Sequence, residues 1–233
     1  MTDLLRRVHP AVRLFSATAV TLMLMPATVR AQDFEFEDEP AKRSVGLVLG
    51  AQQAMSDLKT LTERGLAFGV MARQPIKGSR LLSLRLDADL GTFSQNKNTP
   101  PGGTAGSGEY ETRFTSFRGL LGAQVTADNE TFRPYLHAGA GVGLAQARLS
   151  PLSANISEES TSGVGLAWMA GVGVYRLIGE SDREWALDVG ARLNGMPTID
   201  QPSVIRGQTQ FTTSRRPGTA ASWSFMIGVH VSL

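Results

Sequence analysis

The last segment of the chain, residues 221–233, alternates between large apolar and small or polar residues without interruption. The apolar positions are Ala221, Trp223, Phe225, Ile227, Val229, Val231 and Leu233, and the positions between them are Ser222, Ser224, Met226, Gly228, His230 and Ser232. A period of two predicts a β-strand with one apolar face and one polar or small face.

Seven earlier stretches alternate in the same way and predict seven more strands. Their approximate bounds are 45–55, 63–74, 82–90, 111–126, 132–147, 163–176 and 184–194. The stretch 82–90 has the clearest pattern, because leucines and Ala88 alternate there with Ser83, Arg85, Asp87 and Asp89. Most of the strands reach the roughly 9–11 residues that a tilted strand needs to cross a bilayer.

The predicted connections differ in length from one end to the other. Those after the second, fourth and sixth strands are tight turns, whereas residues 94–110, 149–162 and 195–219 form long polar connections rich in Gly, Pro or Ser. Short periplasmic turns and long external loops are typical of an up-and-down outer-membrane barrel. The fold class predicted is therefore all-β, an eight-stranded antiparallel up-and-down transmembrane β-barrel.

The polar positions of these strands, which alternate with the apolar ones and which we call the polar parity, predict a lumen that contains charges. This parity places eight charged side chains inside the barrel: Arg73, Arg85, Asp87, Asp89, Arg118, Glu184, Asp188 and Arg192. A soluble lipocalin-like barrel also alternates, but its apolar face points inward. Most strand glycines share the parity of the charges, which suits a narrow eight-stranded interior. Trp185 and Trp223 lie near strand ends, where interfacial aromatic girdles occur. These features favour the membrane barrel.

The chain begins with the features of an export signal. Arg6, Arg7 and Arg13 precede a short apolar run that ends at Pro26, and small residues precede Gln32. We expect residues 1–31 to be a cleaved secretory signal peptide, residues 32–43 an acidic periplasmic leader, and residues 44–233 the outer-membrane barrel domain.

Removing four Arg and Asp3 with the signal changes the formal charge from +2 to −1, so the basic composition gives no support for nucleic-acid binding. The absence of cysteine excludes disulfides and thiolate metal sites.

Three segments resemble the small outer-membrane β-barrel family, which includes the opacity proteins and the OmpA/OmpX-type eight-stranded barrels. They are RPYLHAGAGVGLA at 133–145, SFRGLLGAQV at 116–125 and the closing SWSFMIGVHVSL. The resemblance covers about residues 45–233 and implies the barrel architecture, folding by the barrel-assembly machinery and an outer-membrane location. The family usually ends on an aromatic residue, most often Phe, whereas this chain ends on Leu233.

Few residues suggest chemistry. Asp87 and Asp89 resemble a metal or acid/base pair, but buried charges in a small barrel must be paired, so we expect an internal ion-pair network. His137 falls on the lumen parity without a His–Ser constellation, although the resemblance includes barrels that deacylate or acylate lipid A. The GAGVG run at 139–143 lies within a strand and is not followed by a helix, which excludes a phosphate loop. We therefore expect no catalytic, cofactor-binding or metal-binding residues.

The sequence thus predicts a non-enzymatic outer-membrane protein whose external loops mediate surface interaction, adhesion or envelope integrity. The expected partners are outer-membrane lipid and lipopolysaccharide, the barrel-assembly machinery and an extracellular ligand of the loops. We expect a monomer that binds no nucleic acid and needs no cofactor. A barrel enzyme that modifies lipid A and a narrow passive pore are the alternatives.

Overall fold

The computed structural model describes residues 42–77, 79, 81–97, 110–127, 132–151, 158–178, 184–204 and 211–233. The predicted signal peptide and nearly all of the leader lie outside these residues. No helix in the described part of the chain is long and apolar enough to cross a membrane.

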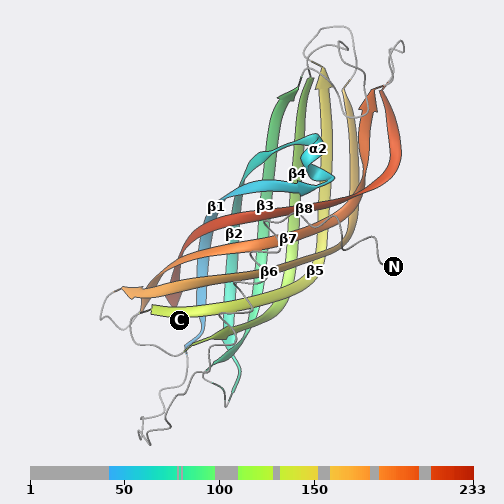
Figure 1. Cartoon of the computed structure of the whole chain (residues 1–233). Coiled ribbons are helices and arrows are strands. Elements are labelled where there is room, and N and C mark those ends of the chain that lie inside the picture. Colours follow the sequence, from blue (N-terminus) through green and yellow to red (C-terminus); the bar gives the residue numbers. More distant parts are fainter. Residues whose placement is uncertain are drawn as a thin grey trace, which may run out of the picture. The chain divides into compact units, whose positions relative to one another are not determined.

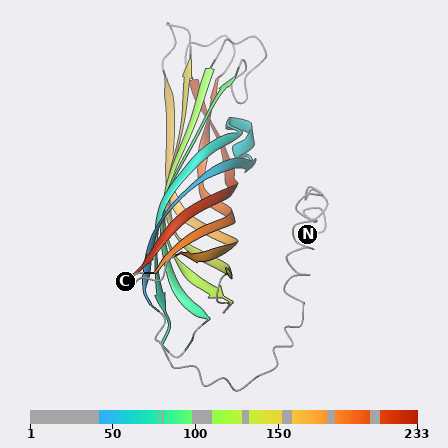
Figure 2. The ribbon, with the colours of Figure 1, turned by 90° about the vertical axis from the view of Figure 1, so that its left-hand side faces the viewer.

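Eight antiparallel strands form one closed barrel, in which each strand pairs with its neighbours in sequence and β8 pairs with β1 (Figure 1). The elements are β1 (Ser44–Ser56), α2 (Leu58–Leu61), β2 (Arg64–Pro75), β3 (Leu82–Lys97), β4 (Tyr110–Thr126), β5 (Phe132–Pro151), β6 (Glu159–Ile178), β7 (Trp185–Val204) and β8 (Phe211–Ser232). Figure 2 shows the strands crossing the barrel wall obliquely. Closure pairs the backbone of every strand on both sides, as a strand in lipid requires.

The start of β1 and the end of β8 meet, since Ser44 pairs with Ser232 and the Leu233 amide donates to the Arg43 carbonyl oxygen at 2.8 Å. The connections after β2, β4 and β6 lie at this same end. We call it the periplasmic end, because the connections after even-numbered strands are the periplasmic turns in this class of barrel. The opposite end, with α2, is the external end.

The predicted orientation of the two faces of the wall, apolar outside and polar in the lumen, is confirmed. The large apolar side chains of the outward parity are exposed on every strand, including Leu47, Phe68, Leu86, Leu121 and Ile227. The side chains of the other parity are buried in the lumen, among them Arg85, Asp87 and Gln124. Water-soluble barrels have the reverse arrangement, so the exposed apolar band identifies a wall that faces lipid.

The long connections predicted at 94–110, 149–162 and 195–219 are shorter than predicted, because the flanking strands extend into each of them from both sides. Strand β3 continues to Lys97, β5 continues to Pro151, and β7 and β8 extend to Val204 and from Phe211. Beyond the membrane these segments need no apolar face, so they lack the alternation that reveals a strand. Their backbones nevertheless pair in register, with shifts in β7–β8 between Met196 and Ile199 and between Asp200 and Gln201.

The connection between β1 and β2 also contains an element that the sequence pattern did not predict. Ser56 adopts the left-handed region with φ of 50°, and the short helix α2 follows immediately. Leu58 and Leu61 of this helix are almost completely buried. The connection therefore folds over the external end of the lumen instead of projecting from it.

Candidate functional site

The lumen contains a charged network of five side chains from three strands: Arg85, Asp87 and Asp89 on β3, Arg118 on β4 and Arg192 on β7. All five are almost completely buried. Alternation along β3 directs its three members to the same side of the strand. Register places Asp89 directly opposite Arg118. The predicted internal ion-pair network around these two carboxylates is confirmed.

The geometry of the charged network pairs each carboxylate with more than one guanidinium. Arg85 binds Asp87 with two nitrogens, Nε to Oδ2 at 2.8 Å and Nη2 to Oδ1 at 2.9 Å. Arg118 Nη2 donates to Asp89 Oδ2 at 3.2 Å. Arg192 Nη1 lies 3.5 Å from Asp89 Oδ1 and 3.9 Å from Asp87 Oδ1, so it bridges the two acids.

This arrangement assigns the two aspartates to charge compensation within the lumen. A buried charge is tolerated when it is paired and hydrogen-bonded. Arg85 Nη1 also donates to Gln124 Oε1 at 2.8 Å, which adds a second side chain of β4 to the contacts of the charged network. Among the described residues no group of three or more His, Asp or Glu side chains has a metal-binding arrangement. That these aspartates bind no metal stays a prediction.

A second cluster, which we call the histidine cluster, lies nearer the periplasmic end and was not predicted. Asp188 accepts a hydrogen bond from the Tyr135 hydroxyl at 2.8 Å, and its other oxygen lies 3.0 Å from His230 Nε2. The ring of Tyr175 stacks on His230 with centroids 6.0 Å apart. Arg73 Nη1 donates to the Tyr175 hydroxyl at 2.6 Å. The cluster joins β2, β5, β6, β7 and β8 across the lumen.

The sequence contains one signal for the histidine cluster, which is the shared lumen parity of Asp188 and His230. The register of β7 against β8 pairs Ala186 with His230 and Asp188 with Gly228, so the two side chains are diagonal neighbours. This register could not be counted back from the turn, because the connection between these strands is not a tight hairpin.

His137 is buried but isolated. Neither of its ring nitrogens has a hydrogen-bond partner among the described residues. Its closest aromatic neighbour is Tyr135, with ring centroids 5.6 Å apart. The facing strand β6 makes room for both rings with glycine: a Cβ at Gly171 would lie 2.5 Å from His137, and one at Gly173 would lie 2.5 Å from Tyr135. Packing therefore positions His137, and the described part of the chain supplies it with neither a nucleophile nor an orienting acid within hydrogen-bond reach.

Glu184 has the predicted lumen parity, because the Ser232 amide donates to its carbonyl oxygen and extends the strand ladder to this residue. This residue precedes β7 at the periplasmic rim, where its carboxylate lies 3.4 Å from the ammonium group of Lys42 and both side chains are about one third exposed. Arg73 is only half-buried, near the same end.

The external end of the lumen is filled by an apolar cluster, which we call the external cap. Its members are Ala54, Leu58, Leu61, Phe93, Phe114, Ala145, Ala147, Met196, Ile199 and Ala220. Phe93 and Phe114 pack edge to face with centroids 5.9 Å apart. The Thr112 hydroxyl donates to the Leu61 carbonyl oxygen, which fixes α2 to β4. Between the external cap and the charged network, Gln52, Asn194, Ser222 and Ser224 form a layer of neutral polar side chains.

The outward face of β3–β6 changes from apolar to polar within one cross-strand row. The last apolar row is Leu90, Phe117, Leu144 and Val164, and the next row is Thr92, Thr115, Gln146 and Ser162. The row after that is Ser94, Arg113, Arg148 and Ser160. We call these two polar rows the external wall. The abrupt change marks the external boundary of the lipid-facing band, because polar outward side chains belong outside the hydrocarbon.

Two arginines are side by side on the external wall. Arg113 and Arg148 are direct register partners, and with Thr115 and Gln146 they line a hollow of about 190 Å³. Each arginine pairs with a carboxylate: Arg113 Nη2 lies 3.0 Å from Glu111, and Arg148 Nε lies 2.9 Å from Glu158. These pairs are solvent-exposed and therefore weak. A guanidinium group has five N–H donors, more than one carboxylate contact uses.

No protein-family model matches the chain. No curated protein matches it either. Among solved structures it is similar to Neisserial surface protein A, at 17% identity over 83% of this chain and 98% of that chain, with a TM-score of 0.49. It is also similar to Ail, the attachment invasion locus protein of Yersinia pestis, at 14% identity over 82% and 99%, with a TM-score of 0.46. The outer membrane protease OmpT of Escherichia coli matches at 6% identity over 85% and 99%, with a TM-score of 0.48.

These neighbours differ in activity, and their low identity gives no information on the chemistry of this chain. The fold follows from the barrel itself: eight antiparallel strands in sequential order, complete closure, an apolar outer band and a charged lumen. The chain therefore has the fold of the small, eight-stranded outer-membrane β-barrels.

Proposed function

We propose that this protein is a non-enzymatic outer-membrane barrel whose external end mediates surface interaction. The observation that carries the proposal is the external wall, where the sheet of β3–β6 continues past the lipid-facing band. A wall that served only to span the membrane would end at the boundary row of Leu90 and Phe117. The additional rows hold polar side chains at the level of the lipid headgroups and beyond.

The chemistry of the external wall suits anionic saccharides and phosphates. Arg113 and Arg148 place two guanidinium groups on adjacent strands, and guanidinium binds phosphate with paired hydrogen bonds. Thr115 and Gln146 add neutral donors and acceptors in the same hollow. Lipopolysaccharide around the barrel presents such groups. An extracellular ligand of the external loops would approach from the same side. Envelope integrity or adhesion would follow from these contacts.

Two features of the lumen argue against the alternatives. The external cap fills the mouth with apolar side chains, and a passive pore for polar solutes needs a continuous polar path. A lipid A-modifying enzyme needs a base, a nucleophile and access for lipid. His137 is buried, and neither of its ring nitrogens has a hydrogen-bond partner among the described residues.

The first experiment orients the barrel and locates its external end. Intact cells that express the protein should be treated with protease, and the fragments identified by mass spectrometry. Cleavage within residues 98–109 or 205–210, with residues 76–81 intact, is the expected result. Cleavage only after cell disruption would place the protein, or at least these connections, away from the cell surface.

The second experiment tests the external wall. The variant R113Q/R148Q should bind immobilised lipopolysaccharide more weakly than the parent barrel, by about tenfold or more given two lost charge-assisted contacts. The exposed Arg176 near the periplasmic end provides the matched control, as R176Q. Equal loss of binding in both variants would indicate unspecific charge attraction, and no loss in either would remove the external wall as the interaction surface.

A further inference from the structure

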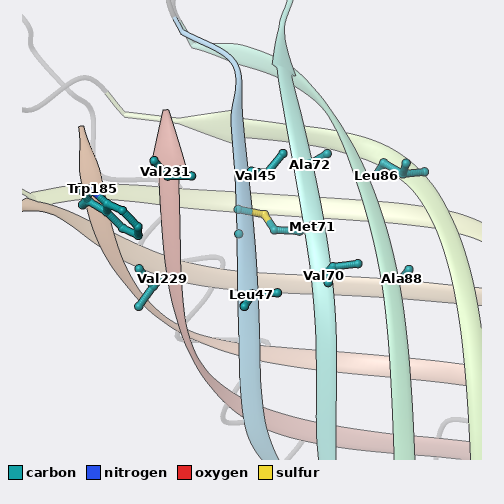
Figure 3. A pocket seen from close by; sticks show the side chains of 11 residues that line it. Val45, Leu47, Val70, Met71, Ala72, Leu86, Ala88, Trp185, Val229 and Val231 are labelled. Atoms are coloured by element: carbon teal, nitrogen blue, oxygen red, sulfur yellow. The ribbon is translucent and has the colours of Figure 1, made fainter. Parts of the chain in front are cut away.

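A shallow groove on the outer face of the barrel lies at the periplasmic end, across the seam where β8 closes against β1. Its volume is about 460 Å³. Figure 3 shows the lining side chains on five neighbouring strands, from Trp185 on β7 to Leu86 and Ala88 on β3. The lining is almost entirely aliphatic, with Trp185 as its one aromatic group. We refer to it as the seam groove.

The seam groove consists of two cross-strand rows of outward residues. The row at the periplasmic side is Trp185, Val231, Val45, Ala72 and Leu86, and the row above it includes Val229, Leu47, Val70 and Ala88. Each row contains one alanine among larger side chains. The small side chains of Ala72 and Ala88 leave a depression that Leu47, Leu86 and Trp185 border. The hollow is thus a consequence of residue size on an otherwise continuous apolar wall.

Cationic groups lie beside the seam groove at the periplasmic rim. Arg43 precedes Val45 by two residues, and the hydrogen bond from Leu233 to its carbonyl oxygen extends the strand ladder to this position. Arg43 is therefore on the outward face directly below the groove. It is exposed, as is Lys77 in the turn after β2, and neither has a side-chain ion pair with another described residue. Lys42 pairs with the partly exposed Glu184.

The indole of Trp185 completes this arrangement. It is about half exposed at the end of the groove nearest the rim, and amphipathic tryptophan rings prefer the level of the lipid headgroups. An aliphatic hollow, an interfacial indole and an exposed guanidinium thus follow one another from the hydrocarbon towards the periplasm. This is the order of acyl chain, glycerol ester and phosphate in a phospholipid of the periplasmic leaflet.

We propose that the seam groove binds one anionic glycerophospholipid of the periplasmic leaflet. An acyl chain occupies the hollow over Ala72 and Ala88, and the phosphate group lies against Arg43. The ligand contacts β7, β8, β1, β2 and β3 together, so it holds the first and last strands of the barrel at their closing seam. This proposal does not depend on the function of the external end.

The experiment uses the full barrel purified from its own membrane in a mild detergent, followed by native mass spectrometry. The parent protein should retain one phospholipid. In exchange experiments it should prefer phosphatidylglycerol to phosphatidylcholine by about fivefold, the factor expected for one cation beside an anionic headgroup. The variant R43Q should lose that preference, and K59Q, which removes an exposed cation at the external end, should keep it.

The hollow is tested separately by filling it. Ala88→Phe or Ala72→Phe should abolish retention of the phospholipid, whereas Ala170→Phe, at an outward alanine of β6 whose register partners Ala138 and Leu193 do not line the groove, should not. If one of the phenylalanine variants fails to fold, the other or Ala88→Leu provides the comparison. Equal retention in all variants would mean unspecific lipid contact and would overturn the proposal. Three other results would also overturn it: lipid A retained in place of a phospholipid, a parent protein without headgroup preference, or a lipid-free dimer formed through this face.

Discussion

The inside–outside assignment of the wall can be tested by placing a cation at Leu86. This residue is 55% exposed on the outer face of β3 and lies within the apolar run from Leu84 to Leu90. A lipid-facing arginine costs about 2–4 kcal/mol near the bilayer midplane and about 0–1 kcal/mol near the interface. On the same strand and face, Thr92 lies one row outside the apolar band and provides the matched control.

We expect Leu86→Arg to destabilise the barrel in phospholipid vesicles. Its free energy of unfolding should fall by at least about 2 kcal/mol more than that of Thr92→Arg, which is a factor of about 30 in the folding equilibrium. Urea titration of each variant in vesicles, followed by the mobility of folded and unfolded protein on unheated gels, measures the difference. The same unfolding midpoint for both variants would show that the band around Leu86 is not in lipid. A barrel with the opposite orientation of its faces would tolerate Leu86→Arg better than Thr92→Arg.

Four further predictions concern the lumen and the processing of the chain. Replacing Asp87 and Asp89 with Asn leaves three buried guanidinium groups uncompensated and should cost about 3–5 kcal/mol of stability in the same urea titration; stoichiometric divalent metal that the double variant loses would instead establish a metal site. N-terminal sequencing of the envelope protein should begin at Gln32, and an intact Met1 would refute cleavage. Lipid A from cells with and without the protein should have the same acylation by mass spectrometry, and a change that disappears in His137→Ala would establish an enzyme. In planar bilayers the barrel should give no steady ion conductance, since the external cap closes its mouth, and a stable open channel would contradict this.

The sequence by itself determined which face of each strand is apolar, because side chains alternate with a period of two and lipid selects large apolar residues at every second position. This was sufficient to predict the strands across the membrane, the lumen position of Asp87 and Asp89 and the closed barrel. It failed where that selection ends. The strand extensions beyond the apolar band carry no alternation, so residues 94–97 and 195–204 were predicted to be irregular.

Only the tertiary structure decided which lumen groups meet. Arg192 reaches Asp87 and Asp89 across the barrel, and Asp188 meets Tyr135 and His230, because closure and strand register bring distant strands to the same level of the lumen. Parity gives the side of a strand but not the register between strands, which depends on every turn and bulge along the chain. For the same reason the inward fold of α2 and the seam groove, which forms across the closing strands, could not be predicted from local sequence patterns.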